Sequence, residues 1–325
     1  MKLSIIVPVF NEKDNLPLLY DATLAAMKNS TYPWEMIFVD DGSRDGSYPI
    51  LEQLAIKDPT HIRVIGLRRN FGQTAAIAAG IDHAEGDVLV PMDADMQNDP
   101  ADIPVMLEKI VEGYDVVSGW RKNRQDNYIT RTLPSNIANS IISWVTGVHL
   151  HDYGCTLKIY RREVITGFRL YGEMHRFIPV YANSVGAKII EIPVHHHARK
   201  YGKAKYGLER TTKVILDLFT VKFLTSYAQK PIYLFGGTGI SLMFLAIVTL
   251  LFLAIRRLGF GVSVFESPLF PVSTMVLLMG FQSILMGLIA ELLVRTYHES
   301  QDKPIYTVRT VLNINPDKNS SQQGS

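Results

Sequence analysis

The chain has 325 residues, a length that allows one large domain and an appended segment. Its formal net charge of +2 gives no strong positive field, so we expect no nucleic-acid partner. The single cysteine, Cys155, excludes an internal disulfide and is interpreted as structural, because no nucleophile motif surrounds it. Met1 and Lys2 lead directly into an apolar strand without the pattern of a signal peptide, which predicts a cytoplasmic N-terminal domain.

Strand-like and helix-like segments alternate from the N-terminus onward. The expected strands are Leu3–Val9, Glu35–Val39, Ile62–Leu67, Val88–Met92 and Asp115–Ser118. The expected helices are Asn15–Lys28, Tyr48–Lys57, Gln73–His83 and Ala101–Glu112. This alternation predicts an α/β domain with a mostly parallel sheet and helices on both of its faces. Ligands of such sheets bind beyond the carboxyl ends of the strands.

Asp93 and Asp95 follow the fourth predicted strand, two positions apart, so both side chains point toward the same region. Two carboxylates this close repel each other unless a cation lies between them, and hard oxygen ligands suit Mg²⁺ or Mn²⁺. A solvated acidic turn is the alternative. Gln97 lies on the same side as Asp95 if the chain stays extended, which makes it a further metal candidate.

Polar residues also follow the first two strands. Glu12 ends the stretch after the first strand, and Asp40-Asp41-Gly42-Ser43 follows the second. Convergence of three acidic clusters on one edge favours a ligand site over a role in solubility. Asp41 is a candidate acceptor for a nucleobase N–H. The chain has neither a G-x-G-x-x-G after the first strand nor a P-loop pattern, which disfavours dinucleotide and P-loop sites.

Basic residues form a second constellation, well suited to phosphate capture or to an anionic lipid headgroup. They are Arg121, Lys122, Arg124 and Arg131 after the fifth strand, and Arg199, Lys200, Lys203 and Lys205 further on. General attraction to anionic lipid is the alternative. His195-His196-His197 does not predict zinc, because adjacent side chains on a strand point to opposite faces and no partner has ligand spacing.

The C-terminal third has two runs without Asp, Glu, Lys or Arg, from Pro231 to Ile255 and from Ser267 to Ala290. Each exceeds the about 20 residues that cross a bilayer, although a buried helix pair is the alternative. Basic residues outside the pair place both termini in the cytoplasm. Gly237 and Ser241, four residues apart, permit helix pairing in a homo-oligomer. The expected segments are a catalytic domain (1–210), a juxtamembrane amphipathic segment (211–229), two membrane helices (231–255 and 267–294) and a tail with a disordered end (295–325).

Four motifs together resemble family 2 glycosyltransferases of the GT-A fold: Val7–Glu12, Val39–Ser43, Arg69–Gln73 and Asp93–Asn98. Within that family the chain is similar to the polyprenyl-phosphate glycosyltransferases. These include dolichol-phosphate mannose synthase and the bacterial undecaprenyl-phosphate glucosyl and aminoarabinose transferases. The stretches Arg121–Asp126 and Asp152–Cys155 look most like the aminoarabinose branch.

The resemblance implies roles for individual residues. Asp93 would lie near the ribose or the donor sugar, and Asp95 and Gln97, with Asp93, would hold Mg²⁺ or Mn²⁺ on the diphosphate. The implied nucleotide-sugar contacts are Pro8, Phe10, Asn11, Glu12, Asp40, Asp41, Gly42, Ser43, Asn70, Gly72, Gln73, Asp93 and Ala94. The implied contacts of the acceptor phosphate are Arg121, Arg131, Arg199, Lys203 and Lys205.

The expected activity is an inverting transfer of one sugar from a UDP- or GDP-sugar to a polyprenyl phosphate at a bacterial plasma membrane. The acceptor phosphate is largely dianionic at neutral pH, since its second pKa is about 6, and needs no general base. Asp152 is the candidate if a base is used. The alternatives are a non-catalytic membrane scaffold and a processive polysaccharide synthase, although the Q-x-x-R-W pattern of the latter is missing.

Overall fold

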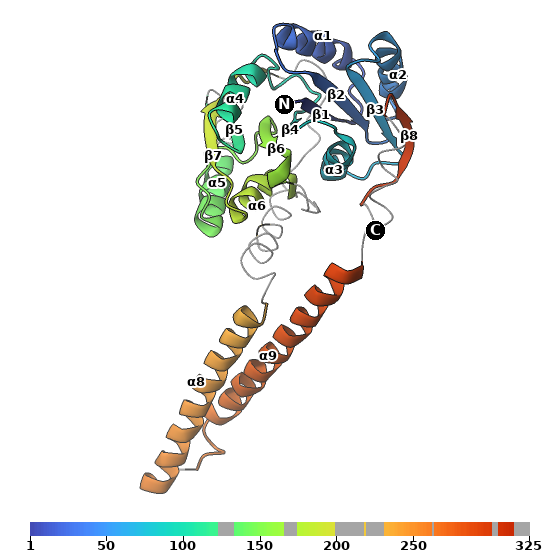
Figure 1. Ribbon diagram of the computed structural model, residues 1–325. Coiled ribbons are helices and arrows are strands. Elements are labelled where there is room, and N and C mark those ends of the chain that lie inside the picture. The colour runs from blue at the N-terminus through green and yellow to red at the C-terminus, as the bar shows by residue number, and fades with distance from the viewer. Residues whose placement is uncertain are drawn as a thin grey trace. The chain divides into compact units, whose positions relative to one another are not determined.

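The computed structural model describes residues 1–122, 133–165, 174–198, 218, 231–261, 263–300 and 305–314. The chain divides into two units. One comprises residues 1–221 together with 304–325, and the other comprises residues 222–303 (Figure 1). Each is described by itself below.

The described part of the first unit is built on an eight-stranded sheet with the order β7-β5-β6-β4-β1-β2-β3-β8. The strands are β1 (Leu3–Val9), β2 (Trp34–Asp40), β3 (Ile62–Leu67), β4 (Val88–Pro91), β5 (Val116–Trp120), β6 (Lys158–Arg161), β7 (Ile189–Pro193) and β8 (Val308–Leu312). β1 pairs in parallel with β2 and β4, as do β2 with β3 and β5 with β7. β6 and β8 are antiparallel to their neighbours. The loop that precedes β6 therefore reaches the edge where the parallel strands end.

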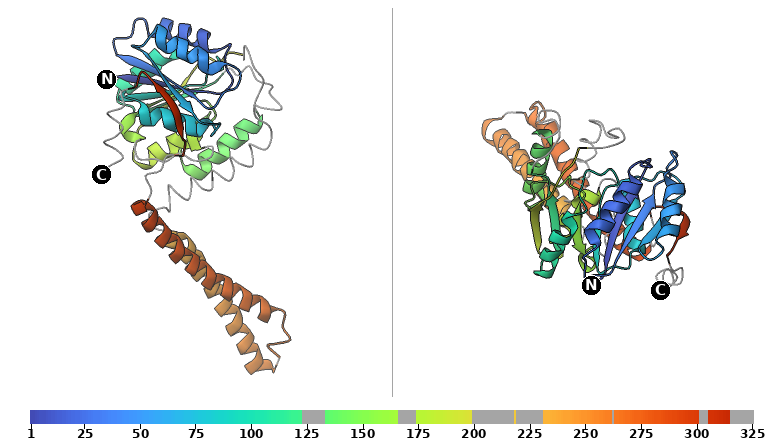
Figure 2. Two further views of the ribbon diagram at one scale, coloured as in Figure 1. Left: turned by 90° about the vertical axis from the view of Figure 1, so that its right-hand side faces the viewer. Right: turned by 90° about the horizontal axis from the view of Figure 1, so that it is seen from above.

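Helices cover both faces of this sheet, as Figure 2 shows for α1 and α2 on one side and α3 on the other. The helices are α1 (Leu16–Met27), α2 (Ser47–Lys57), α3 (Gln73–His83), α4 (Asp102–Val111), α5 (Leu133–Thr146) and α6 (Ile178–Ser184), with short 3₁₀ turns η2 (Arg162–Val164) and η3 (Met174–Phe177). Because side chains alternate along a strand, Ile5 and Val7 of β1 join the core under α1, α2 and α4. Ile6 joins the core on the other face, with α3, α5 and α6.

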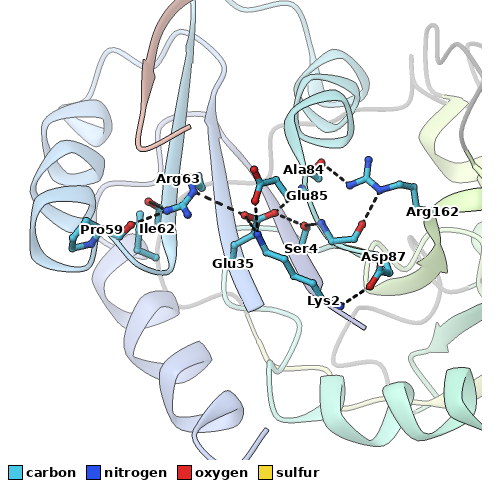
Figure 3. Close-up of polar contacts among 11 residues, drawn as sticks. Lys2, Ser4, Glu35, Pro59, Ile62, Arg63, Ala84, Glu85, Asp87 and Arg162 are labelled. Atoms are coloured by element: carbon cyan, nitrogen blue, oxygen red, sulfur yellow. Dashed lines mark hydrogen bonds and ion pairs between the residues drawn. The ribbon is translucent and has the colours of Figure 1, made fainter. Parts of the chain in front are cut away.

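The amino ends of the strands are held by a polar network around Glu35 of β2 (Figure 3). The buried Glu35 carboxylate accepts hydrogen bonds from Ser4 Oγ at 2.6 Å, from the Glu85 backbone N–H at 2.7 Å and from Lys2 Nζ at 2.9 Å. Arg162 donates to the carbonyls of Gly86 at 2.7 Å and Ala84 at 2.6 Å. These contacts join β1, β2, β4 and β6 at the edge opposite the strand ends that carry the candidate ligands.

The last strand, β8, follows the second unit in the sequence but belongs to the sheet of the first unit. β8 pairs antiparallel with β3, Tyr48 Oη lies 2.6 Å from Thr310 Oγ1, and Tyr306 Oη donates to Asp82 of α3 at 2.8 Å. Asn313, at the start of the end (313–325) that was predicted to be disordered, donates from Nδ2 to the carbonyls of Ala55 at 2.9 Å and Ile62 at 3.1 Å. The chain therefore returns to the first unit after the apolar helices.

The second unit contains two long helices, α8 (Pro231–Phe260) and α9 (Leu269–Ser300). Leu234–Gly259 and Leu269–Ala290 are long and apolar enough to be candidate membrane spans. The helices pack closely at a pair of glycines, because a Cβ on Gly239 would lie 2.6 Å from the Gly280 carbonyl oxygen. Ser283 Oγ donates to the Phe235 carbonyl at 2.8 Å. Small residues thus allow the two helices to approach each other closely.

All nine predicted elements of the N-terminal region are present, with ends shifted by at most two residues. The sequence did not predict β6, β7, β8, α5 or α6. The amphipathic segment expected at 211–229 lies outside the described residues, apart from Leu218, which is buried in the second core.

Candidate active site

Asp41, at the end of β2, holds the loop that follows β3. Its Oδ1 accepts the Phe71 N–H at 2.7 Å, and its Oδ2 accepts the Gly72 N–H at 2.9 Å. Gly42 has φ +71°, and a Cβ there would lie 2.7 Å from the Arg69 carbonyl carbon. Burial raises the pKa of Asp41 and also that of the neighbouring Asp40. Asp41 is 3% exposed, so its contact with a nucleobase stays a prediction, whereas its hold on the loop after β3 is observed.

The loop after β1 is tied to the loop after β2. The Asn11 N–H donates to Ser43 Oγ at 3.0 Å, the Glu12 N–H donates to Ser47 Oγ at 2.9 Å, and Asn11 Oδ1 accepts the Arg44 N–H at 2.8 Å. Asn11 has φ +53°, a conformation that Asn tolerates better than most residues. Together with Asp40 and Asp41, these loops bring the predicted nucleotide contacts after β1 and β2 together. Pro8, in β1, pairs with Val39 of β2, while Phe10 is half-buried and Asn70 is exposed.

Asp93, after β4, is oriented from two sides. Its Oδ1 accepts a hydrogen bond from Gln73 Nε2 of α3, and its Oδ2 accepts one from Thr156 Oγ1 before β6, both at 2.7 Å. Ala94 is buried in the core and alternates with the two aspartates. Gln73, predicted as a nucleotide contact, therefore positions Asp93. Thr156 was missed, because its approach depends on β6 running antiparallel to β4.

Asp95 is 8% exposed, and its Oδ1 accepts the Gln97 N–H at 3.2 Å across a turn in which Met96 has φ +61°. Gln97 therefore does not continue an extended chain from Asp95. Its carbonyl accepts the His197 N–H at 2.9 Å. Two carboxylates at one strand end fit Mg²⁺ or Mn²⁺, which take one or two protein carboxylates and complete their shell with phosphate oxygens and water.

Arg121, after β5, forms a bidentate ion pair with Asp152, from Nε to Oδ2 at 2.7 Å and from Nη2 to Oδ1 at 2.9 Å. Asp152 Oδ1 also accepts the Gly154 N–H at 3.1 Å. A predicted phosphate ligand and a predicted base are therefore bonded to each other. The Arg121 side chain is 17% exposed, and its partner Asp152 belongs to the loop that carries Thr156.

Two further residues hold the loop from His151 to Thr156. Glu191 of β7 accepts the Asp152 N–H at Oε1 and the His151 N–H at Oε2, both at 3.0 Å. Lys158 of β6 is fully buried and donates to the carbonyls of Tyr153, at 3.2 Å, and Cys155. Burial lowers the pKa of Lys158 and raises that of Cys155 to about 11. A buried thiol of this kind is structural, as expected.

A small cavity and an aromatic pair flank this loop. The cavity has about 10 Å³, room for about one water, and is lined by Lys158, His175 and Arg176 among others. The Trp120 and His151 rings stack with centroids 4.4 Å apart. Neither Glu191 nor Trp120 carried a sequence signal, since both depend on the pairing of β5 with β7.

The three histidines lie next to the loop after Asp95. His195 Nδ1 lies 2.7 Å from Asp102 Oδ1, and His197 Nε2 lies 2.9 Å from Asp99 Oδ2. They fasten the end of β7 to the start of α4. Four predicted phosphate ligands, Arg131, Arg199, Lys203 and Lys205, lie outside the described residues, as do Arg124 and Lys200.

Residues 4–168 match the family described as glycosyl transferase family 2. The chain belongs to this family. It is 43% identical to a dodecaprenyl-phosphate galacturonate synthase of Rhizobium johnstonii, over 96% of this chain and 93% of that protein. It is 39% identical to an undecaprenyl-phosphate 4-deoxy-4-formamido-L-arabinose transferase of Pseudomonas fluorescens, over 97% and 91%. The family 2 glycosyltransferase is thus similar to polyprenyl-phosphate enzymes along nearly its whole length, as the motifs predicted.

Among solved structures, the glycosyltransferase resembles glucosyl-3-phosphoglycerate synthase from Mycobacterium tuberculosis. The complex of that enzyme with Mn²⁺, UDP and phosphoglyceric acid gives a TM-score of 0.51 at 16% identity, over 69% of this chain and 78% of that one. Its complex with Mg²⁺ and UDP gives 0.50 at 16% identity, over 69% and 79%. At this identity the likeness shows the fold alone, and it confirms the predicted GT-A-like α/β domain.

Proposed function

We propose that this glycosyltransferase transfers one sugar, with inversion, from a nucleoside-diphosphate sugar to a polyprenyl phosphate at the cytoplasmic face of a bacterial plasma membrane. The observation that carries the proposal is the position of Asp93. Gln73, at the start of α3, and Thr156, in the loop before β6, fix its carboxylate from two sides. The loop of Thr156 also carries Asp152, the ion-pair partner of Arg121. Full-length similarity to two polyprenyl-phosphate enzymes supports the choice of acceptor.

The donor nucleotide would lie over the ends of β1 and β2. Asp41 offers its remaining lone pairs to the base, and the Asn11–Glu12 backbone, tied to Ser43 and Ser47, shapes the pocket. A divalent cation held by Asp93, Asp95 and Gln97 would neutralise the charge of the leaving diphosphate. The Asp93 oxygens already accept two hydrogen bonds, so the carboxylate is preorganised before the donor binds.

The acceptor phosphate would approach from the side of Arg121. One of its oxygens attacks the anomeric carbon as the bond to the diphosphate breaks, so the configuration inverts. Arg121 keeps its charge because Asp152 faces it, and the part of its side chain that stays exposed, 17%, can contact the phosphate. Asp152 accepts hydrogen bonds at both oxygens and is 1% exposed, which favours a positioning role over a general base. Arg131, Arg199, Lys203 and Lys205 remain proposed as the further phosphate ligands.

The return of the chain supports the proposed topology. β8 follows α9, yet it pairs with β3 in the sheet that precedes α8. The residues before and after the two apolar helices must therefore lie on one side of any membrane that the helices cross. Two spans satisfy this requirement, and one span would not. The basic flanks favour the cytoplasm as that side.

A donor screen tests the proposal. Detergent-solubilised protein, polyprenyl phosphate and Mg²⁺ or Mn²⁺ are incubated with labelled UDP- and GDP-sugars, including galacturonate and 4-deoxy-4-formamido-L-arabinose. Metal-dependent label in the organic phase from one donor, lost in Asp95→Asn, would establish the reaction and name the sugar. Nucleotide-sugar binding without transfer from any donor would favour the scaffold, and a polymer would favour a processive synthase.

A further inference from the structure

Strand β8 carries a β-bulge at Arg309. Thr310 pairs with one residue of β3 and Val308 with the next, which leaves Arg309 as an extra residue between them. A bulge of this kind changes the alternation of side chains between the two faces of a sheet. Val308 packs in the second core and Leu312 packs against the first, although regular alternation would place both on one face. The bulge therefore reverses the faces of the strand at Arg309.

Because of the bulge, two successive residues of β8 contact one side chain of α2. Arg309 lies over the Tyr48 ring, with Cζ 4.8 Å from the ring centroid, and Thr310 Oγ1 lies 2.6 Å from Tyr48 Oη. Successive residues of a regular strand point to opposite faces and could not both reach Tyr48. Gly66 of β3 makes room for the contact, since a Cβ there would lie 2.5 Å from Thr310 Oγ1 and 2.9 Å from Tyr48 Cε2. The bulge thus turns Arg309 to the face of the sheet that α2 covers.

The charge of Arg309 reaches the end of β2. Asp40, Gly66 and Thr310 lie side by side in register on β2, β3 and β8, so about 10 Å separates Asp40 from Thr310. Burial raises the pKa of Asp40, and the Ser43 hydrogen bonds and the charge of Arg309 oppose that rise. A cation that follows the two apolar helices in the sequence therefore acts on a carboxylate of the candidate nucleotide site.

Asp40 connects that charge to the two loops that the donor nucleotide would contact. Its two carboxylate oxygens lie 3.3 Å and 3.4 Å from the Ser43 N–H nitrogen that donates to them. Ser43 Oγ in turn accepts the Asn11 N–H at 3.0 Å, which ties the loop after β1 to the loop after β2. An ionised carboxylate accepts such hydrogen bonds more strongly than a protonated one. Loss of the Arg309 charge therefore favours protonated Asp40 and loosens both loops.

We propose that Arg309 is a positioning residue for the donor nucleotide, supplied by the strand that follows the two apolar helices. It acts through Asp40 and Tyr48 on the loops after β1 and β2, and it touches no reacting atom. The inference rests on the proposed function and adds to it. The donor site depends on chain segments from both before and after the candidate spans, because β8 lies beyond them in the sequence.

Nucleotide binding at several pH values tests the proposal. The full-length, detergent-solubilised protein is titrated with UDP and with GDP in the presence of Mg²⁺, and isothermal titration calorimetry gives the Kd. Arg309→Gln removes the charge, and Arg309→Lys keeps it. Lys57→Gln is the matched control, because Lys57 Nζ lies over the Tyr20 ring at the same 4.8 Å, at the other end of α2. Thermal unfolding of each variant separates lost affinity from lost stability.

Arg309→Gln is expected to raise the Kd of the preferred nucleotide by about 2- to 30-fold, the range for residues that act through their neighbours. The rise should be largest at low pH. Without Arg309 the pKa of Asp40 moves further up, so its ionised form is lost at a higher pH as the pH falls. The other charged groups that face Asp40, which are Asp41 and Asp45, are unchanged. Arg309→Lys should restore most of the affinity, and Lys57→Gln should leave the Kd unchanged.

Should Arg309→Gln fail to fold, Arg309→Met reports the same loss of charge, since its unbranched side chain still packs on the Tyr48 ring. Unchanged Kd values of Arg309→Gln at every pH, or an equal change in Lys57→Gln, would overturn the inference and leave the proposed function intact. A loss of affinity that Arg309→Lys does not reverse would overturn it as well. Wild-type protein that binds neither UDP nor GDP would refute the proposed function, and this inference with it.

Discussion

Arg121 and Asp152 form a bidentate ion pair, 2.7 Å and 2.9 Å in its two hydrogen bonds, at the edge of the sheet where the parallel strands end. Burial alone would lower the pKa of Arg121, but the Asp152 charge and hydrogen bonds outweigh it and raise that pKa above its usual value. Arg121 is therefore a permanent cation in a fixed orientation, which is what recognition of a phosphate requires.

Asp152→Asn is expected to destabilise the domain by about 3–5 kcal/mol, because it leaves the Arg121 charge without its partner. Chemical denaturation of the solubilised protein measures the loss. Glu112→Gln is the matched control. It breaks the exposed Lys109–Glu112 pair of 2.7 Å on α4 and should cost at most about 1 kcal/mol.

The same Asp152→Asn variant separates the two roles of this residue. A positioning role predicts that transfer recovers in part at low temperature, together with folding. If the variant were as stable as the wild type and transfer were still abolished, the result would favour a general-base role for Asp152.

Gly42→Ala is expected to loosen the nucleotide loops. The new Cβ would lie 2.7 Å from the Arg69 carbonyl carbon and 2.8 Å from the Asn70 nitrogen, and φ at Gly42 is +71°. Strain at one such position is of order 1–3 kcal/mol, and it acts on the loop that Asp41 holds. We expect a higher KM for the donor as well as a lower melting temperature. Gly113→Ala carries a similar φ of +101° but meets nothing within 4 Å, so it should cost stability without changing the KM. Equal KM changes in both variants would contradict the assignment.

The alternating part of the fold could be predicted because each strand from β1 to β4 is a buried apolar run followed by a helix with its own periodicity. β6 has only four residues, Lys158–Arg161, and half of them are basic, so neither pattern is visible. β8 could not be predicted either, because its pairing with β3 spans the two apolar helices and depends on contacts distant in sequence.

The residues of the candidate site also divide into those that local sequence reveals and those that only strand pairing reveals. Asp41, Asp93 and Asp95 could be found because strand ends converge and D-x-D is local. Glu191 and Thr156 could not, since their roles depend on which strands neighbour β5 and β4. The sequence also suggested that Asp152 and Arg121 act on the substrate separately, whereas the structure pairs them. Local patterns reveal residue types, but only pairing reveals which charges neutralise one another.

Removal of divalent cations is expected to abolish transfer, and Mg²⁺ or Mn²⁺ should restore it. Asp95→Asn should require a much higher cation concentration for half-maximal activity, since a neutral amide is a weaker ligand than a carboxylate. Gln73→Ala is the comparison variant, because it removes the hydrogen bond to Asp93 but none of the proposed cation ligands. It should lower kcat with a smaller change in cation affinity. Cation titrations of the transfer rate measure both, and activity that persists in chelator would refute the metal proposal.

Glu35→Ala is expected to lower stability through the amino edge of the sheet. It leaves the Glu85 N–H and Ser4 Oγ without their buried acceptor, at about 1–3 kcal/mol for each unsatisfied group. Because this network lies at the opposite edge from Asp93, kcat at a temperature where the variant is folded should equal that of the wild type. Thermal unfolding and initial rates at two temperatures measure the effect. A reduced kcat in fully folded Glu35→Ala would show that the two edges are coupled.

His195 gives the end of β7 a pH-dependent attachment. Its hydrogen bond to Asp102 and the Asp102 charge raise the pKa of His195 above 6.5, with a smaller contribution from Asp99. A raised folded-state pKa means that this contact contributes fully below about pH 6.5 and is lost as the pH rises through the raised value. Hydrogen exchange of residues 194–198, corrected for the intrinsic rate, should therefore become faster as the pH rises through that window.

His195→Gln should remove the pH dependence. His83→Gln, in α3, should leave it intact, since Nδ1 of His83 faces only the Ala79 carbonyl at 2.8 Å among its described contacts. Exchange that does not vary with pH in the wild type, or that varies equally in His195→Gln, would show that the Asp102 contact does not secure this segment.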